Sequence, residues 1–157
     1  MIGGGYSFSP LCWTDDNQLS LQRFTGIESA DLERRRVWVR AGTRLQRLAE
    51  VLADRGLALE NAPDFDQQSL AGALATGTHG SGAAFGNLGS LVTALRVVCA
   101  DGATHTLSAE QDPDLFHAAV VSLGALGIVT HIELQCVDDY RLELRTQAAT
   151  LGETLTR

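Results

Sequence analysis

Four glycines alternate with small hydroxyl residues in the stretch 68–82, which reads Gln-Ser-Leu-Ala-Gly-Ala-Leu-Ala-Thr-Gly-Thr-His-Gly-Ser-Gly. Glycine permits positive φ and lets another group approach the backbone closely. The N–H groups of such turns form concave nests that bind anions, and the hydroxyls of Thr76, Thr78 and Ser81 can donate to phosphate oxygens or ring acceptors. We interpret the stretch as a loop wrapped around a large polar ligand. A mobile surface linker is the alternative that composition alone leaves open.

A second glycine-rich turn opens the chain, where Gly3, Gly4 and Gly5 precede Tyr6 and Ser7. Three consecutive glycines offer three unobstructed backbone donors, which would suit a pyrophosphate. The same residues could equally form a loose N-terminal tail. The residue types alone do not decide between these two readings.

The remaining reactive side chains do not form a recognisable catalytic or metal-binding set. The histidines, which are His79, His105, His117 and His131, lack the i, i+4 spacing of a helical metal pair. His79 differs from the other three because it lies within the glycine-rich stretch. Ser81 does not stand in a Gly-x-Ser-x-Gly elbow. We therefore expect no metal site, and we assign no catalytic residue.

Composition excludes several classes of function. The 157 residues suffice for one domain with a real core, and their formal charge of −7 argues against general nucleic-acid binding. No apolar run approaches membrane-spanning length. The three cysteines, Cys12, Cys99 and Cys136, have no close pairing, which favours reduced core thiols and a cytoplasmic location.

The two glycine motifs resemble the flavin-binding loops of the vanillyl-alcohol oxidase/p-cresol methylhydroxylase flavoproteins, and within them those of the sugar-lactone and alditol oxidases. The stretch Ser122–Thr130 agrees with the same family in order and spacing. The resemblance extends to about Val137 and covers only part of the family's polypeptide. It implies an α+β fold, in which two small lobes clamp FAD between them.

The resemblance also implies a set of FAD-contacting positions. These are Gly3, Gly4, Gly5, Tyr6, Ser7, Asp64, Ser69, Gly72, Thr76, Gly77, Thr78, His79, Gly80, Ile128 and Val129. In covalent members of the family, a histidine linked to the flavin occupies the position of Tyr6. Tyrosine has no imidazole nitrogen, so the resemblance implies FAD that is bound non-covalently.

Hydrophobic periodicity predicts the elements that carry these residues. We expect strands at 19–21, near Ile27, and at 35–41, 57–59, 91–100, 104–107, 128–137 and 140–144. A helix should follow Thr43, with Thr43 and Gln46 as a capping box and Gly56 after its end. A second helix should start at Asp112-Pro113. Asp101-Gly102 indicates a two-residue hairpin turn, and 151–157 resembles the first turn of a helix.

These elements give an α+β domain that we expect to be truncated at its N-terminus. We predict part of a first FAD-binding lobe at 1–56, a second lobe at 57–137, and the start of a substrate or cap domain at 138–157. The resemblance implies the FAD-binding portion of an oxidoreductase that oxidises a CH–OH group of a sugar, polyol or aldonolactone, similar to D-arabinono-1,4-lactone oxidase. Oxygen or another acceptor would then reoxidise the FAD. Two alternatives remain, an inactive folded remnant and a small nucleotide- or anion-binding module.

Overall fold

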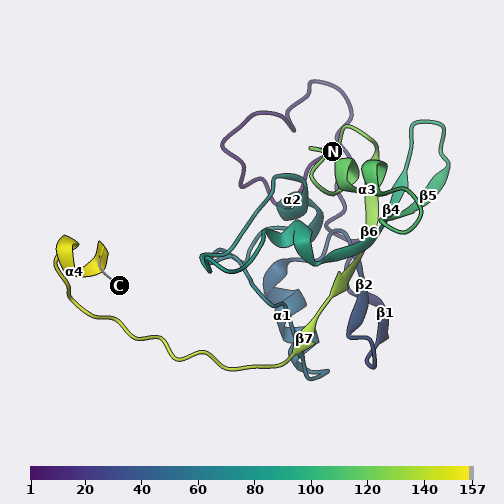
Figure 1. The fold of residues 1–157 in the computed structure, drawn as a ribbon. Coiled ribbons are helices and arrows are strands. Elements are labelled where there is room, and N and C mark those ends of the chain that lie inside the picture. Colours follow the sequence, from purple (N-terminus) through teal and green to yellow (C-terminus); the bar gives the residue numbers. More distant parts are fainter. Residues whose placement is uncertain (156–157) are drawn as a thin grey trace.

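The centre of the computed structural model, which describes residues 1–155, is a five-stranded sheet in the order β1-β2-β6-β4-β5 (Figure 1). Every neighbouring pair in this sheet is antiparallel. The strands are β1 (Ile27–Asp31), β2 (Arg36–Arg40), β4 (Val92–Val98), β5 (Thr104–Ser108) and β6 (Ile128–Gln135). The mixture of this sheet with separate helices confirms the predicted α+β class.

A row of aliphatic side chains crosses all five strands on one face of the sheet. Consecutive partners along this row are Ile27, Val39, Ile132, Leu95 and Leu107. Residues at alternate positions of a strand share a face, so Val37 and Leu134 form a second buried pair beside this row. This face is the sheet's contribution to the hydrophobic core.

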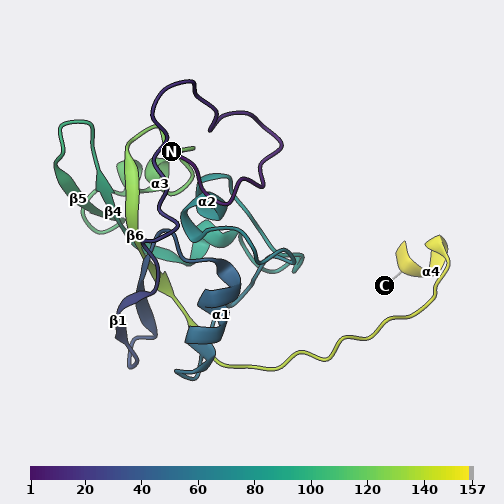
Figure 2. The ribbon, with the colours of Figure 1, turned by 180° about the vertical axis from the view of Figure 1, so that it is seen from behind.

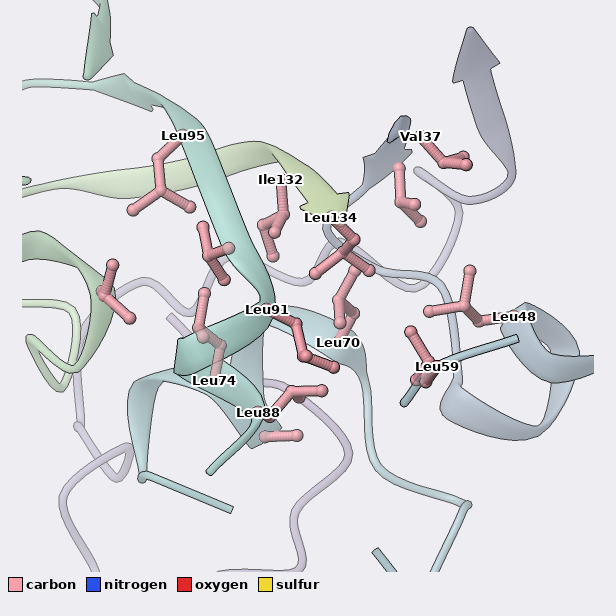
Figure 3. Close-up of a cluster of buried hydrophobic side chains, with 14 of the residues drawn as sticks. Val37, Leu48, Leu59, Leu70, Leu74, Leu88, Leu91, Leu95, Ile132 and Leu134 are labelled. Atoms are coloured by element: carbon pink, nitrogen blue, oxygen red, sulfur yellow. The ribbon is translucent and has the colours of Figure 1, made fainter. Parts of the chain in front are cut away.

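Helices cover that apolar face. They are α1 (Leu45–Ala53), α2 (Leu70–Ala75), the short 3₁₀ helix η1 (Leu88–Leu91) and α3 (Pro113–Val120). Figure 3 shows Leu48 of α1, Leu70 and Leu74 of α2, and Leu88 and Leu91 of η1 pointing toward Leu95, Ile132 and Leu134 of the sheet. The helices and the sheet therefore share one core.

The opposite face of the sheet carries an ordered polar cluster. His131 of β6 pairs with Arg40 of β2 on one side and with Arg96 of β4 on the other. Glu28 lies 2.5 Å from an Arg96 nitrogen and 3.3 Å from Nε2 of His131. The Arg96 guanidinium also stacks on the Trp38 ring at 4.4 Å, a favourable cation–π arrangement. The strands thus alternate between apolar and polar faces.

The last part of the chain leaves the globular body. A two-stranded sheet of β3 (Leu57–Ala58) and β7 (Val137–Asp138) ends the folded region. Residues 139–150 then run outward without helix or strand to α4 (Leu151–Leu155), as both Figure 1 and Figure 2 show. The strand predicted at 140–144 is therefore wrong. The predicted helical turn at 151–157 is present in α4, while 156–157 lie outside the described residues.

One helix-cap prediction failed because the predicted capping hydroxyl forms tertiary hydrogen bonds instead. Thr43 does not cap α1, because its hydroxyl donates to the Arg40 carbonyl at 2.7 Å and accepts from the Gly26 N–H at 2.9 Å. Arg44 occupies the N-cap position without a side-chain bond. In contrast, Asp112 caps α3 as predicted, since its side chain accepts from the Leu115 N–H.

Two strand predictions also need correction. The region 19–21 is not a strand, because only Ser20 forms an isolated bridge, to Ile2. The hairpin at Asp101-Gly102 is present, but the Cys99 N–H bonds to the Ala103 carbonyl. Three residues therefore lie in the loop, with Gly102 at positive φ, a common form of hairpin connection.

The sheet crosses the predicted lobe boundary at residue 56. Strand β2, which precedes the boundary, pairs along its length with β6, which follows it. Leu45 and Leu48 of α1 belong to the same hydrophobic cluster as Leu70 of α2. Residues on both sides of position 56 thus contribute to the five-stranded sheet and its core, and the division into two lobes and a cap domain stays a prediction. No helix among residues 1–155 is long and apolar enough to cross a membrane.

Candidate functional site

The two glycine-rich motifs meet at the start of α2. A Cβ added to Gly3 would lie 2.6 Å from Oγ of Ser69 and 3.6 Å from Cα of Gly72. A Cβ on Gly72 would in turn lie 3.0 Å from the same Ser69 oxygen. Glycine at both positions is what lets the N-terminal segment run so close to the helix.

A cleft of about 400 Å³ opens between these two segments, within the usual size range of cofactor sites. Predicted site residues that line it are Gly3, Gly4, Gly5, Tyr6, Ser7, Ser69, Gly72 and Thr76. The structure therefore brings together the glycine turn at the beginning of the chain and the first half of the long glycine motif. Leu123, Gly124 and Ala125, which follow α3, complete the wall of the cleft.

Free backbone donors line this cleft on its N-terminal side. The N–H groups of Gly3, Gly4 and Gly5 donate to no acceptor among residues 1–155. The opposite wall differs, since the N–H groups of Leu70 and Ala71 in α2 already bond to the carbonyls of Thr43 and Ala41. These two α2 donors are therefore occupied, whereas the donors of the glycine turn are not.

An aromatic pair stands beside the cleft. The rings of Tyr6 and Phe65 meet edge to face with centroids 4.7 Å apart, and each side chain is 46% exposed. Edge-to-face contact holds both rings while leaving a ring face available. Tyr6 thus presents a flat apolar surface next to the free glycine donors.

The second half of the long glycine motif lies outside this cleft. Gly77 follows α2 at φ +68° and its N–H bonds to the Leu74 carbonyl, which is a helix-ending arrangement. A Cβ on Gly80 would lie 2.3 Å from Oδ1 of Asn61 and 2.6 Å from the Ala62 carbonyl oxygen. Protein atoms therefore already fill the space beside Gly80.

The other predicted contact residues are dispersed around the site. Thr78 bonds through its backbone to Leu88, and Nδ1 of His79 lies 2.9 Å from the Gly80 carbonyl oxygen. Asp64 is exposed in the loop before α2. Ile128 and Val129 begin β6, where they pair with β4. None of these residues lines the cleft, and their contact with a cofactor stays a prediction.

A second cleft of similar size adjoins the first. It shares with the first cleft Met1, Gly3, Gly4, Ser69 and Ala71. Beyond these residues its wall includes Arg44 and Arg47 of the α1 region. The Arg44 guanidinium contacts the Gln67 carbonyl, and Arg47 pairs with Glu50. The N-terminal glycine segment therefore has open space on both sides.

The predicted site residues lacked two polar residues of the main cleft, Ser9 and Gln68, of which Gln68 lies immediately before α2. Gln68 is the first residue of the stretch 68–82, in which glycine and hydroxyl residues were predicted to bind the ligand. Residues 70–75 were also interpreted as part of a loop, whereas they form α2 with Leu70, Ala73 and Leu74 buried. The apolar spacing at 70, 73 and 74 was the signal that could have revealed the helix.

Neither a metal centre nor a disulfide occurs among residues 1–155. Burial raises the pKa of the Cys136 thiol to about 11, which leaves it protonated and unreactive at neutral pH. Cys12 lines the main cleft and is partly exposed. The predicted cytoplasmic location stays a prediction.

Comparison with known proteins agrees with this geometry. A family model described as FAD binding domain matches residues 1–108. The chain is 42% identical over 140 residues to a putative D-arabinono-1,4-lactone oxidase of Neurospora crassa, and 38% identical over 156 residues to an L-gulono-1,4-lactone dehydrogenase of Mycobacterium tuberculosis. These matches cover 89% and 99% of this chain.

The chain spans only 25% of the length of the first of these relatives and 36% of the second. A solved structure of alkyldihydroxyacetonephosphate synthase superposes with a TM-score of 0.77 and 24% identity, over 87% of this chain and 26% of that one. This match shows a shared fold over most of the chain, and the family model identifies it as an FAD-binding domain.

Proposed function

This chain belongs to the family of FAD-binding domains, and from that premise we propose that it is the FAD-binding part of an oxidoreductase acting on a CH–OH group. The proposed substrate is a sugar lactone or a related polyol, because the Neurospora crassa and Mycobacterium tuberculosis relatives are named as a sugar-lactone oxidase and a sugar-lactone dehydrogenase. Their names include both enzyme types, so the proposal covers dioxygen and other electron acceptors.

The observation that carries the proposal is the cleft between the two glycine motifs. Its free N–H groups at Gly3, Gly4 and Gly5 fit the acceptor oxygens of a pyrophosphate. The ring of Tyr6 fits the flat, apolar part of a flavin. A site with anion-binding donors at one place and an aromatic surface beside them suits a dinucleotide better than a simple anion.

Within this proposal the chain's residues bind and orient the cofactor. FAD, when bound, supplies the two-electron redox chemistry that side chains of this site lack. The glycine turn 3–5 holds the phosphates, Ser69 and Gly72 close the opposite wall, and Tyr6 supports the ring system. We propose that the FAD is held non-covalently, since Tyr6 stands where the resemblance places the flavin-linking histidine.

Fluorescence titration of FAD with the purified chain tests the binding part of this proposal. We expect saturable quenching that ADP reverses, because ADP carries the same pyrophosphate. Gly3→Leu should abolish the quenching, since its side chain would enter the gap that ends 2.6 Å from the Ser69 oxygen. The exposed Arg34→Ala variant is the control. If the wild-type chain neither quenches FAD nor retains it in dialysis, the proposed function is wrong.

A further inference from the structure

One polar atom at the main cleft has no partner. The side-chain oxygen Oε1 of Gln68 is buried and accepts no hydrogen bond within residues 1–155. The other end of the same amide, Nε2, lies 3.4 Å from Oγ1 of Thr78 and donates to it. A buried carbonyl oxygen without a donor destabilises a protein, so a native sequence that retains one calls for an explanation.

The backbone around Gln68 holds this amide in place. The Gln68 carbonyl accepts a 3.0 Å hydrogen bond from the N–H of Leu45, the first residue of α1. The next residue, Ser69, forms an isolated bridge with Arg44. Gln68 is thereby held between α1 and α2, and it is one of the residues that line the cleft.

The chemistry of the unpaired atom limits what it can contact. A glutamine oxygen only accepts hydrogen bonds, and phosphate oxygens also act as acceptors, so Oε1 cannot bind the phosphates. The donors available on the flavin half of FAD are its ribityl hydroxyls and its ring N–H. Gln68 lines the same cleft as Tyr6, the residue whose ring the proposed function places against the flavin.

We propose that Gln68 is a cofactor-selecting residue whose Oε1 accepts a hydrogen bond from a hydroxyl or N–H of the flavin half of FAD. Its Nε2 bond to Thr78 orients the amide and connects the cofactor to the glycine motif beyond α2. This inference rests on the proposed FAD-binding function. It divides recognition between the glycine turn, which binds phosphate, and Gln68, which recognises the flavin.

The test uses FMN and ADP as separate probes for the two parts of FAD. Gln68→Met keeps a side chain of similar length but has no strong acceptor. We expect its dissociation constants for FAD and FMN to rise about 3- to 10-fold, the usual effect of losing one neutral hydrogen bond. Affinity for ADP, measured by competition, should not change. The midpoint of thermal unfolding without ligand should stay equal or rise, because an unsatisfied buried oxygen is removed.

The neighbouring Gln67→Met is the matched control. Gln67 lines neither cleft, and its amide already donates to Gln46 and Asp66, so its FMN affinity should equal that of the wild type. Unchanged FMN affinity in Gln68→Met overturns the inference while leaving FAD binding intact. An equal loss for FMN and ADP, or a lower unfolding midpoint without ligand, shows a structural role and also overturns it. A wild-type chain that binds neither FAD nor FMN overturns the proposed function as well.

Discussion

Glycines of the same motif serve different purposes at the level of single residues. The resemblance assigned Gly72, Gly77 and Gly80 to one ligand loop. In the structure Gly72 faces the N-terminal segment, Gly77 ends α2 at positive φ, and Gly80 approaches Asn61. The sequence could predict that these positions need glycine. It could not predict which neighbour each one meets, because the neighbours lie far away in the chain.

Gly80→Ala should therefore act through the protein's own packing. The added methyl group would overlap the Ala62 carbonyl and the Asn61 side chain, and such overpacking costs about 1–3 kcal/mol. We expect a lower unfolding midpoint in the absence of any ligand, and weaker FAD retention as a consequence. Arg34→Ala, whose side chain is 77% exposed, should match the wild type. An unchanged midpoint combined with lost FAD binding would instead place Gly80 in direct contact with the cofactor.

Tyr6 determines how the cofactor should be attached. Because its phenol cannot form the histidine linkage of covalent relatives, acid or heat denaturation should release all flavin into the supernatant. Cys12 is the thiol that lines the same cleft, and Cys12→Ser should release flavin equally. Gel electrophoresis under denaturing conditions followed by fluorescence imaging checks this prediction. Flavin fluorescence that migrates with the polypeptide would refute it.

Elements with a strong internal pattern were predictable. Leu45, Leu48 and Leu52 repeat at helical spacing and form the buried face of α1, and β4 and β5 flank the predicted turn at Gly102. Thr43 shows the limit of such reasoning. Its sequence context matches a capping box, but the prediction was wrong because Arg44 is the N-cap residue and the Thr43 hydroxyl accepts a hydrogen bond from the distant Gly26 N–H.

The central strand β6 should carry much of the stability. Leu134 is fully buried between β2 and β4, and removing such a side chain typically costs about 2–5 kcal/mol. We expect Leu134→Ala to lower the unfolding free energy by that amount in urea denaturation. Leu144→Ala makes the same chemical change at a side chain that is 92% exposed, and it should stay within about 0.5 kcal/mol of wild type. Similar losses in both variants would contradict the arrangement of the core.

The polar face of the sheet should make stability depend on pH. Burial lowers the pKa of His131, while Glu28 opposes this shift and Arg96 and Arg40 reinforce it. The unfolded chain then takes up a proton at higher pH than the folded chain does. The contribution of His131 to the free energy of unfolding is therefore complete above about pH 6.5 and decreases as the pH falls below that value.

Substitution of His131 by glutamine removes this titration. As the pH falls from about 7.5 to 5.5, the unfolding midpoint of the wild type should therefore decrease relative to that of His131→Gln. Thermal melts in a pH series measure it. A difference that stays constant over this range would show that His131 does not titrate differently in the two states.

At the scale of the whole molecule, the site depends on a segment with little support. The turn at Gly3–Gly5 forms one wall of the cleft, yet the chain that follows it is exposed, with Trp13 at 81%. Composition and periodicity could not place this segment against α2, because that contact depends on long-range packing of glycine backbones. Eight of the residues that the resemblance implies line one cleft in the structure, and their contact with a cofactor stays a prediction.

Because the cleft wall formed by the N-terminal segment has little support, the isolated chain should bind FAD weakly. Ordering the N-terminal segment around a cofactor costs conformational entropy, and affinity falls in proportion to the population of the binding-competent state. We expect the 157 residues alone to bind FAD with a dissociation constant above the micromolar range. They should release no peroxide with aldonolactones or polyols, because the chain spans only 25% to 36% of the relatives' length and this cleft holds no assigned catalytic group. Sub-micromolar FAD binding together with substrate-dependent peroxide would show that residues 1–155 already contain a complete active site.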